Sequence, residues 1–140
     1  MGRLDRERIL VKVDQLDRYL AELSVVAPER REAYAETKTK RACERLLQLC
    51  VEVVVDICAL LVSGLRLGIP SEEDDLIGKL AQHGILSDEL ARTIRMMKGL
   101  RNVLVHEYAQ IDDDLVFEAL SEREAGFSAF RREIIALLER

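Results

Sequence analysis

The stretch that most restricts the fold of this chain is residues 29–63, which contain neither glycine nor proline. Because nothing in this stretch interrupts a helix, we expect one long helix that ends at Gly64, Gly68 and Pro70. Its second half, residues 46–62, is apolar on nearly all sides. That pattern is typical of a helix that several neighbours bury, so the chain should fold as an all-α bundle around it.

The remaining segments predict further helices around this one. Apolar residues repeat at helical spacing over residues 3–24, which predicts a first helix there. Ser71 and the acidic residues after it resemble a capping box, so a short helix is expected to start at Ser71 and to end at Gly84. Ser87 and Asp112 are in positions to cap two more helices. The predicted fold is an all-α, up-and-down bundle of four main helices plus one short helix, with residues 1–140 as a single domain.

Length and charge restrict the classes of function. The chain has 140 residues and a formal net charge of −5, whereas a protein that holds nucleic acid by overall charge is usually basic. Any contact with RNA would therefore depend on a local group of cations or on a second chain. The charged N-terminal residues, and the acids Glu52 and Asp56 within the apolar stretch, predict a soluble cytoplasmic protein with no signal peptide and no membrane span.

Three cysteines, Cys43, Cys50 and Cys58, lie on the long predicted helix. Their spacing separates them by about 10–12 Å along the helix axis, which is too far for disulfides among them. No histidine or cysteine pair accompanies them at zinc spacing. We therefore expect buried, reduced cysteines, and no metal site or cofactor is predicted.

A cluster of polar residues stands among leucines and valines in residues 99–112, GLRNVLVHEYAQID. With Arg101 as the origin on a helix, Asn102 lies near 100°, His106 near 140° and Tyr108 near −20°, a broad shared arc. Histidine can take and give protons near neutral pH, and arginine presents a fixed positive charge suited to phosphate. Since no carboxylate cluster accompanies them, metal-free chemistry on a phosphodiester fits better than metal-assisted hydrolysis. Taken alone, such residues are more often a structural pair.

The order Arg101-Asn102-Val-Leu-Val-His106-Glu-Tyr108 resembles the Arg-x4-His-x-Tyr signature of the HEPN superfamily, in the form found in HepT-type toxins. The flanking residues 97–100 and 111–112, and the order of the helices, extend this resemblance over most of the chain. The resemblance implies a helical homodimer whose two motifs meet at an interface cleft and cleave RNA without metal.

The resemblance also implies a role for each residue of the motif. His106 would be the acid/base residue, Arg101 would act on the phosphate, Asn102 would support the site, and the ribose 2′-hydroxyl would attack the adjacent phosphate. A minimal nucleotidyltransferase antitoxin would neutralise the toxin, in some systems by attaching AMP to the tyrosine, here Tyr108.

Two further groups of residues have a structural and a functional interpretation. Glu52 and Asp56 belong to a polar stripe on the long helix, which is either its water-facing side or a source of carboxylates that orient Arg101 or His106. Arg95 and Lys98 precede the motif three residues apart, a step that drifts about 60° around a helix, and they form either a solvated surface or an RNA track in a dimer.

The sequence leaves two main functions open. The first is a metal-independent endoribonuclease toxin. The alternative is a non-catalytic HEPN module that binds a nucleotidyltransferase partner or a nucleotide through the same cleft. Retention of Arg101, Asn102, His106 and Tyr108 favours the enzyme, because a degenerate module does not need all four. A purely structural scaffold would leave the motif unexplained.

Overall fold

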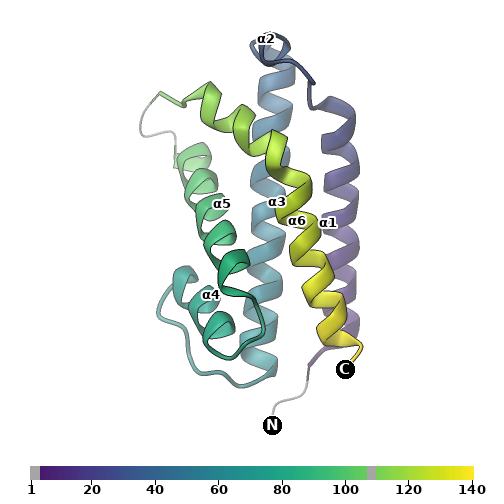
Figure 1. Ribbon diagram of the computed structural model, residues 1–140, viewed down its shortest axis with the longest axis vertical. Helices are drawn as coiled ribbons and strands as arrows, with labels where there is room; N and C mark the ends of the chain where they lie inside the picture. Colours follow the sequence, from purple (N-terminus) through teal and green to yellow (C-terminus); the bar gives the residue numbers. More distant parts are fainter. Residues whose placement is uncertain (1–3, 107–109) are drawn as a thin grey trace.

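The computed structural model describes residues 4–106 and 110–140, and these residues form helices without any strand. The prediction of an all-α bundle is therefore confirmed, with two short helices where one was expected. Figure 1 shows them in chain order: α1 (Arg6–Val26), α2 (Arg31–Tyr34), α3 (Thr37–Gly64), α4 (Glu73–Gln82), α5 (Asp88–His106) and α6 (Asp113–Leu138).

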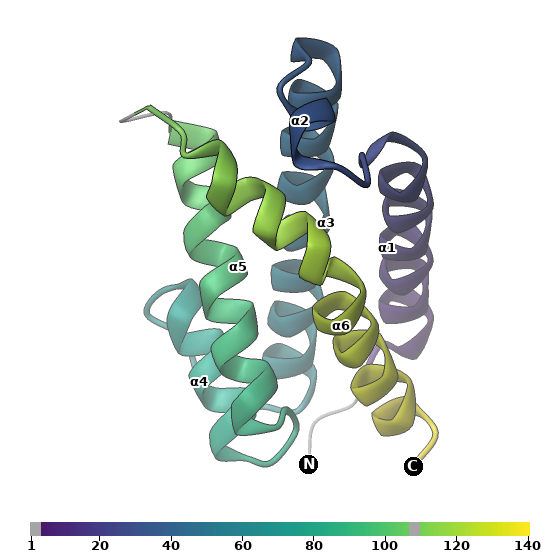
Figure 2. The same ribbon diagram turned by 45° about the horizontal axis from the view of Figure 1, so that its top comes forward.

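Helix α3 is the centre of the bundle. It lies between α1 and α5, α6 crosses it at an angle, and α4 packs near its C-terminal end (Figures 1 and 2). Its length and composition would allow it to cross a membrane, but 56% of its most apolar window is buried inside the protein. The apolar surface of α3 thus serves the core, where side chains such as Ile57 and Leu61 are fully buried.

The prediction of one helix over residues 29–63 is wrong, because the chain breaks between Tyr34 and Thr37. Glu36 is the N-cap of α3, and its carboxylate accepts hydrogen bonds from the Thr39 hydroxyl at 2.7 Å and from the backbone N–H groups of Thr39 and Lys38. These bonds, that from the Thr39 hydroxyl first, hold the pKa of Glu36 below its usual value. Capping by a glutamate, rather than a glycine or proline, therefore marks the start of α3.

The expected caps have mixed outcomes. The Ser87 hydroxyl accepts a hydrogen bond from the Leu90 backbone N–H at 3.2 Å, and Asp112 caps α6 by accepting from the Asp114 N–H at 2.9 Å, as predicted. The capping box at Ser71 is wrong. Helix α4 begins two residues later with Glu72 as its N-cap, and no side chain caps it. This shift places Glu73 in the first turn of α4, which matters for the site.

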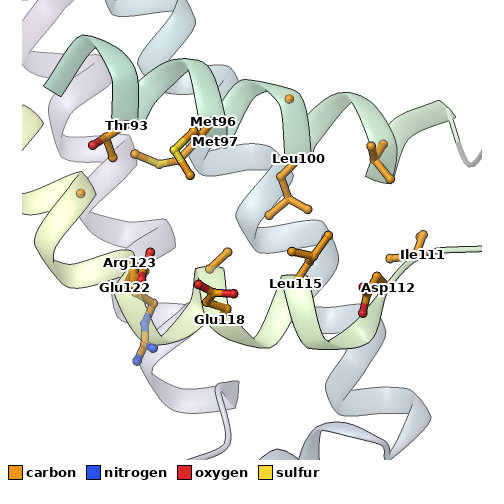
Figure 3. A pocket seen from close by; sticks show the side chains of 14 residues that line it. Thr93, Met96, Met97, Leu100, Ile111, Asp112, Leu115, Glu118, Glu122 and Arg123 are labelled. Carbon is orange, nitrogen blue, oxygen red and sulfur yellow. The ribbon is translucent and has the colours of Figure 1, made fainter. Parts of the chain in front are cut away.

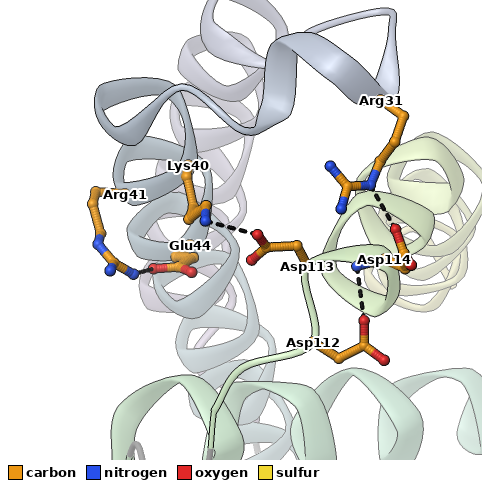
Figure 4. A network of polar contacts seen from close by, with 7 residues as sticks. All are labelled: Arg31, Lys40, Arg41, Glu44, Asp112, Asp113 and Asp114. Atoms are coloured by element: carbon orange, nitrogen blue, oxygen red, sulfur yellow. Dashed lines mark hydrogen bonds and ion pairs between the residues drawn. The ribbon is translucent and has the colours of Figure 1, made fainter.

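The start of α6 is tied to α2 and α3 by ion pairs (Figure 4). Lys40 of α3 lies 2.7 Å from the Asp113 carboxylate, and both side chains are about three-quarters buried. Arg31 of α2 donates to Asp114 at 2.6 Å in a more exposed pair. Together with the Asp112 cap, these contacts fix where α6 begins after the motif-bearing helix.

The cysteines are free and buried, as predicted. Burial raises the pKa of the Cys50 and Cys58 thiols to about 12 and also raises that of Cys43. At neutral pH these thiols are therefore protonated, which makes them poor nucleophiles. They belong to the core and take no part in the candidate site.

Candidate active site

The polar motif lies at the C-terminal end of α5, whose last residue is His106. Arg101 and Asn102 are partly buried there, whereas His106 is exposed. Arg101 and His106 are about 140° apart around the helix and about 7.5 Å apart along it. Tyr108, the expected modification site, lies outside the described residues. Within one chain, then, Arg101 points inward and His106 points outward.

Arg101 is the most enclosed residue of the motif, with a side chain that is 11% exposed. It lines a small cavity together with Val51 of α3 and Phe127 of α6. Its Nη2 donates a hydrogen bond to the carboxylate of Glu73, in the first turn of α4. Its Nε is buried and has no hydrogen-bond partner among residues 4–106 and 110–140. A buried guanidinium requires a counter-charge, and the Glu73 carboxylate supplies it.

A second ion pair joins the same two helices. Lys98, whose side chain is 13% exposed, lies 2.7 Å from the carboxylate of Asp74. Arg95 is exposed, and its guanidinium lies over Gly78 of α4. Of the two cations predicted to bind RNA, Lys98 is thus already paired within the chain, and the RNA-binding role of Arg95 stays a prediction.

The carboxylates of α3 lie elsewhere. Asp56 accepts a hydrogen bond from Lys12 of α1 at 3.0 Å, and Glu52 accepts one from Gln48 on its own helix at 3.0 Å. The carboxylate that the structure describes on Arg101 is that of Glu73, and a role of Glu52 or Asp56 in orienting Arg101 or His106 stays a prediction. Asp56 is more than half exposed, in keeping with the water-facing alternative.

Sequence reasoning missed Glu73 and Asp74 as neighbours of the motif. Both are visible in the sequence as an acidic run, but that run was interpreted as part of a capping box. An acidic first turn also suits the positive end of a helix dipole, so the local sequence gives no sign of a distant partner. Only the antiparallel packing of α4 on α5, which pairs Glu73 with Arg101 and Asp74 with Lys98, shows it.

On its other side, α5 faces α6 across an open groove with a volume of about 430 Å³ (Figure 3). The walls are mostly apolar, and they include Met96 and Val103 of α5 and Leu115 of α6, whose exposed fractions are 75%, 46% and 58%. Gly126 of α6 also lines the groove, and the side chains of Met97 and Thr93 of α5 lie close to it. The groove therefore lies directly beside the motif and leaves large apolar side chains in contact with water.

The sequence profile of the ribonuclease HepT-like family matches residues 9–134. The chain belongs to this family. The HepT-like match includes every helix of the bundle apart from the ends of α1 and α6, and it contains the whole motif.

Named relatives agree with this assignment. A tRNA nuclease HepT of Aphanizomenon flos-aquae is 38% identical over 95 residues, and an mRNA nuclease HepT of Shewanella oneidensis is 32% identical over 84. These matches include 68% and 60% of this HepT-like chain, and they span 65% and 63% of the relatives' own lengths, slightly less than two thirds. An Archaeoglobus fulgidus protein, named provisionally as an RNase, is 31% identical over 96% of both chains.

Solved structures show the same fold. A tri-AMPylated Shewanella oneidensis HEPN toxin in complex with its MNT antitoxin has a TM-score of 0.86 and 26% identity, over 91% of this chain and 96% of that one. A toxin–antitoxin complex with AMP-PNP has a TM-score of 0.85 and 25% identity, over 91% and 97%. The HepT-like chain therefore has the fold of HEPN toxins that were solved together with antitoxins.

Proposed function

We propose that this HepT-like protein is a metal-independent endoribonuclease toxin that acts as a homodimer and is neutralised by a nucleotidyltransferase antitoxin in the cytoplasm. Residues 1–140 would form a single HEPN-like domain, in keeping with the one hydrophobic core that its helices share. The observation that carries the proposal is the position of the motif. Arg101 and His106 lie within the family-matched region at the end of α5, and Val103 between them lines the open groove.

The proposed reaction is the attack of a ribose 2′-hydroxyl on the adjacent phosphate. His106 takes the proton of that hydroxyl as the bond from O2′ to phosphorus forms, and the bond to the 5′ oxygen breaks. Protonated His106 then gives this proton to the leaving 5′ oxygen and returns to its starting state, so the products are a cyclic phosphate and a 5′-hydroxyl end. Arg101 supplies the fixed positive charge that stabilises the phosphate oxygens in the transition state, and Asn102 orients the reacting groups.

A homodimer is supported by the two sides of α5. Arg101 and His106 of one chain diverge by about 140°, so one phosphate would not easily contact both within that chain. A second copy seated on the groove would cover Met96, Val103 and Leu115 and would bring a second motif to the same cleft. The exposed His106 of each chain would then face RNA that lies across the interface.

The proposed antitoxin is a minimal nucleotidyltransferase, and the proposed modification site is Tyr108. Support comes from the solved HEPN toxin that carries AMP groups and is bound to an MNT antitoxin. Tyr108 follows Arg101 by seven residues in the sequence, so phosphate attached to its phenol would compete with RNA phosphate for the cations of the motif. A Tyr108→Phe variant should remain toxic and escape modification, and unchanged neutralisation of this variant would contradict the assignment.

A second candidate function is a binding module without catalysis. The observation that favours it is the ion pair of Arg101 with Glu73, which occupies part of the guanidinium and keeps it mostly buried. Such a module would bind a nucleotidyltransferase partner or a nucleotide at the groove.

The deciding experiment compares purified wild type with His106→Ala on a labelled RNA, with metal chelated. Cleavage by the wild type alone, giving 5′-hydroxyl ends, is the expected result. Equal cleavage by both proteins would contradict the proposed function, because the activity would then not depend on His106. No cleavage by a folded wild type freed from its antitoxin would favour the binding module.

A further inference from the structure

The packing of α4 on α5 brings Glu73, a residue far from the motif in sequence, into contact with Arg101. Glu73 comes 28 residues before Arg101, and its carboxylate is the partner that the structure describes for the Arg101 guanidinium. Glu73 is 42% exposed and Arg101 is 11% exposed, so the pair lies at the boundary between core and solvent. Glu73 is the more exposed partner and engages Nη2, so the small exposed part of the Arg101 side chain is what remains for a ligand to contact.

Helix α4 holds Glu73 firmly in place. Leu76, Ile77 and Leu80 are buried and attach α4 to the core. The pair of Lys98 with Asp74, one residue after Glu73, fixes the register of α4 against α5. The Glu73 carboxylate therefore reaches Arg101 from a short helix whose position is set independently of the motif.

From this geometry we propose that Glu73 is a positioning residue, which holds the Arg101 guanidinium in the orientation that contacts the RNA phosphate. The inference rests on the proposed ribonuclease function and extends the active site to α4. An arginine presents five N–H donors, and one carboxylate engages only part of them. A positioned guanidinium acts on the transition state without first having to be ordered, whereas the same side chain without its anchor can adopt many rotamers.

This role makes a specific kinetic prediction. Removal of the carboxylate leaves the positive charge of Arg101 in place and takes away a negative charge that repels RNA. The Michaelis constant for RNA should therefore not rise, whereas kcat should fall about 10–100-fold, as expected when an orienting group is lost. A Glu73 that merely blocked Arg101 would have the opposite effect on kcat.

The test measures kcat and KM of Glu73→Ala and Glu73→Gln on a fluorogenic RNA oligonucleotide. Asp17→Ala is the matched control, because it removes another ion pair between helices, that of Asp17 with Arg131 at 2.9 Å. We expect a loss of kcat in Glu73→Ala, a smaller loss in Glu73→Gln, which retains a hydrogen-bond acceptor, and wild-type kinetics in Asp17→Ala. Unchanged or increased kcat in Glu73→Ala would overturn the proposal, as would a loss no larger than its unfolded fraction.

A spectroscopic measurement separates this proposal from the proposed function. The Nε–H signal of Arg101, assigned by comparison with Arg101→Lys in a ¹⁵N-arginine sample, should be sharp in the wild type and broadened or shifted in Glu73→Ala. If the wild type does not cleave RNA more than His106→Ala does, the proposed function fails. The positioning of Arg101 is then decided by this signal alone, and an Nε–H signal unchanged in Glu73→Ala would overturn it.

Discussion

The two sides of α5 differ in how completely a single chain fills them. Toward α4, the charged side chains Arg101 and Lys98 are nearly buried and paired with carboxylates of the first turn of α4. Toward α6, the groove of about 430 Å³ remains open, and Met96 and Leu115 are largely exposed. One side is polar and closed, and the other is apolar and open.

This difference separates what the chain provides alone from what it needs from another molecule. A buried charge without a partner is costly, so the pairs toward α4 must form within the monomer. Exposing apolar side chains to water is unfavourable in proportion to their area, and a second molecule that covers them removes this cost. We therefore infer that the α4 side prepares the motif and the α6 side recruits a second copy.

The largest effect is expected where α6 closes onto the core. Phe127 is 1% exposed and borders the small cavity that Arg101 also lines. Phe127→Ala should lower the free energy of unfolding by about 3–5 kcal/mol, because it leaves a cavity in a packed core. Urea unfolding followed by circular dichroism measures this. A loss below about 1 kcal/mol would mean that α6 is loosely held along its whole length, and the contrast between the two sides of α5 would disappear.

A smaller effect is expected from the polar side. Glu73→Ala should lower the free energy of unfolding by about 1.5–3 kcal/mol, because it deprives a buried arginine of a charged hydrogen-bond partner. Asp56→Ala removes the more exposed pair with Lys12 and should cost less than about 1 kcal/mol. Both variants are measured in the same urea series. Equal losses would show that burial of Arg101 does not distinguish the two pairs.

The crossing of α5 and α6 gives a third comparison. A Cβ on Gly126 would come 2.9 Å from the terminal methyl of Met97 and 3.3 Å from a methyl of Thr93. Met97 is flexible and can move, so Gly126→Ala should change the free energy of unfolding by less than about 1 kcal/mol, helped by the helix propensity of alanine. Gly126→Val should cost about 1–3 kcal/mol by forcing the helices apart. Thermal unfolding of both variants measures these changes. A Gly126→Val variant as stable as the wild type would contradict the close approach of Met97 and Thr93 to Gly126.

Sequence patterns were sufficient for the fold because helical periodicity is local. The repeats of apolar residues located α1 within a few residues of its observed ends, and Ser87 and Asp112 were correctly assigned as the caps at which α5 and α6 begin. The break at residues 35–36 was missed because it depends on capping by Glu36 and on the burial of Tyr34, neither of which interrupts the helical pattern.

The sequence predicted only those residues of the candidate site that lie on a single helix. Arg101, Asn102 and His106 share α5, so their spacing gave their relative directions. The partner of Arg101 lies on another helix, and Glu52, Asp56 and Glu73 are equally plausible from spacing alone. Tertiary packing selects Glu73, since α4 lies antiparallel to α5, whereas Asp56 faces Lys12 of α1. An acidic residue at a helix start looks the same in sequence whether it serves the helix dipole or a distant cation.

A substitution in the wall of the groove between α5 and α6 should have the smallest effect on folding. It also gives the sharpest test of whether a second molecule covers this groove. Leu115 is 58% exposed, so Leu115→Ser should change the stability of the monomer by no more than about 0.5 kcal/mol. If a second copy covers the groove, the same substitution removes apolar burial from both chains, and the dissociation constant of the dimer should rise at least about ten-fold. Sedimentation over a concentration series measures it, with Val25→Ser, an 85% exposed position on α1, as the matched control. Equal dissociation constants for the two variants would place the dimer interface elsewhere, and the open groove would then belong to a different partner, with the antitoxin as the next to test.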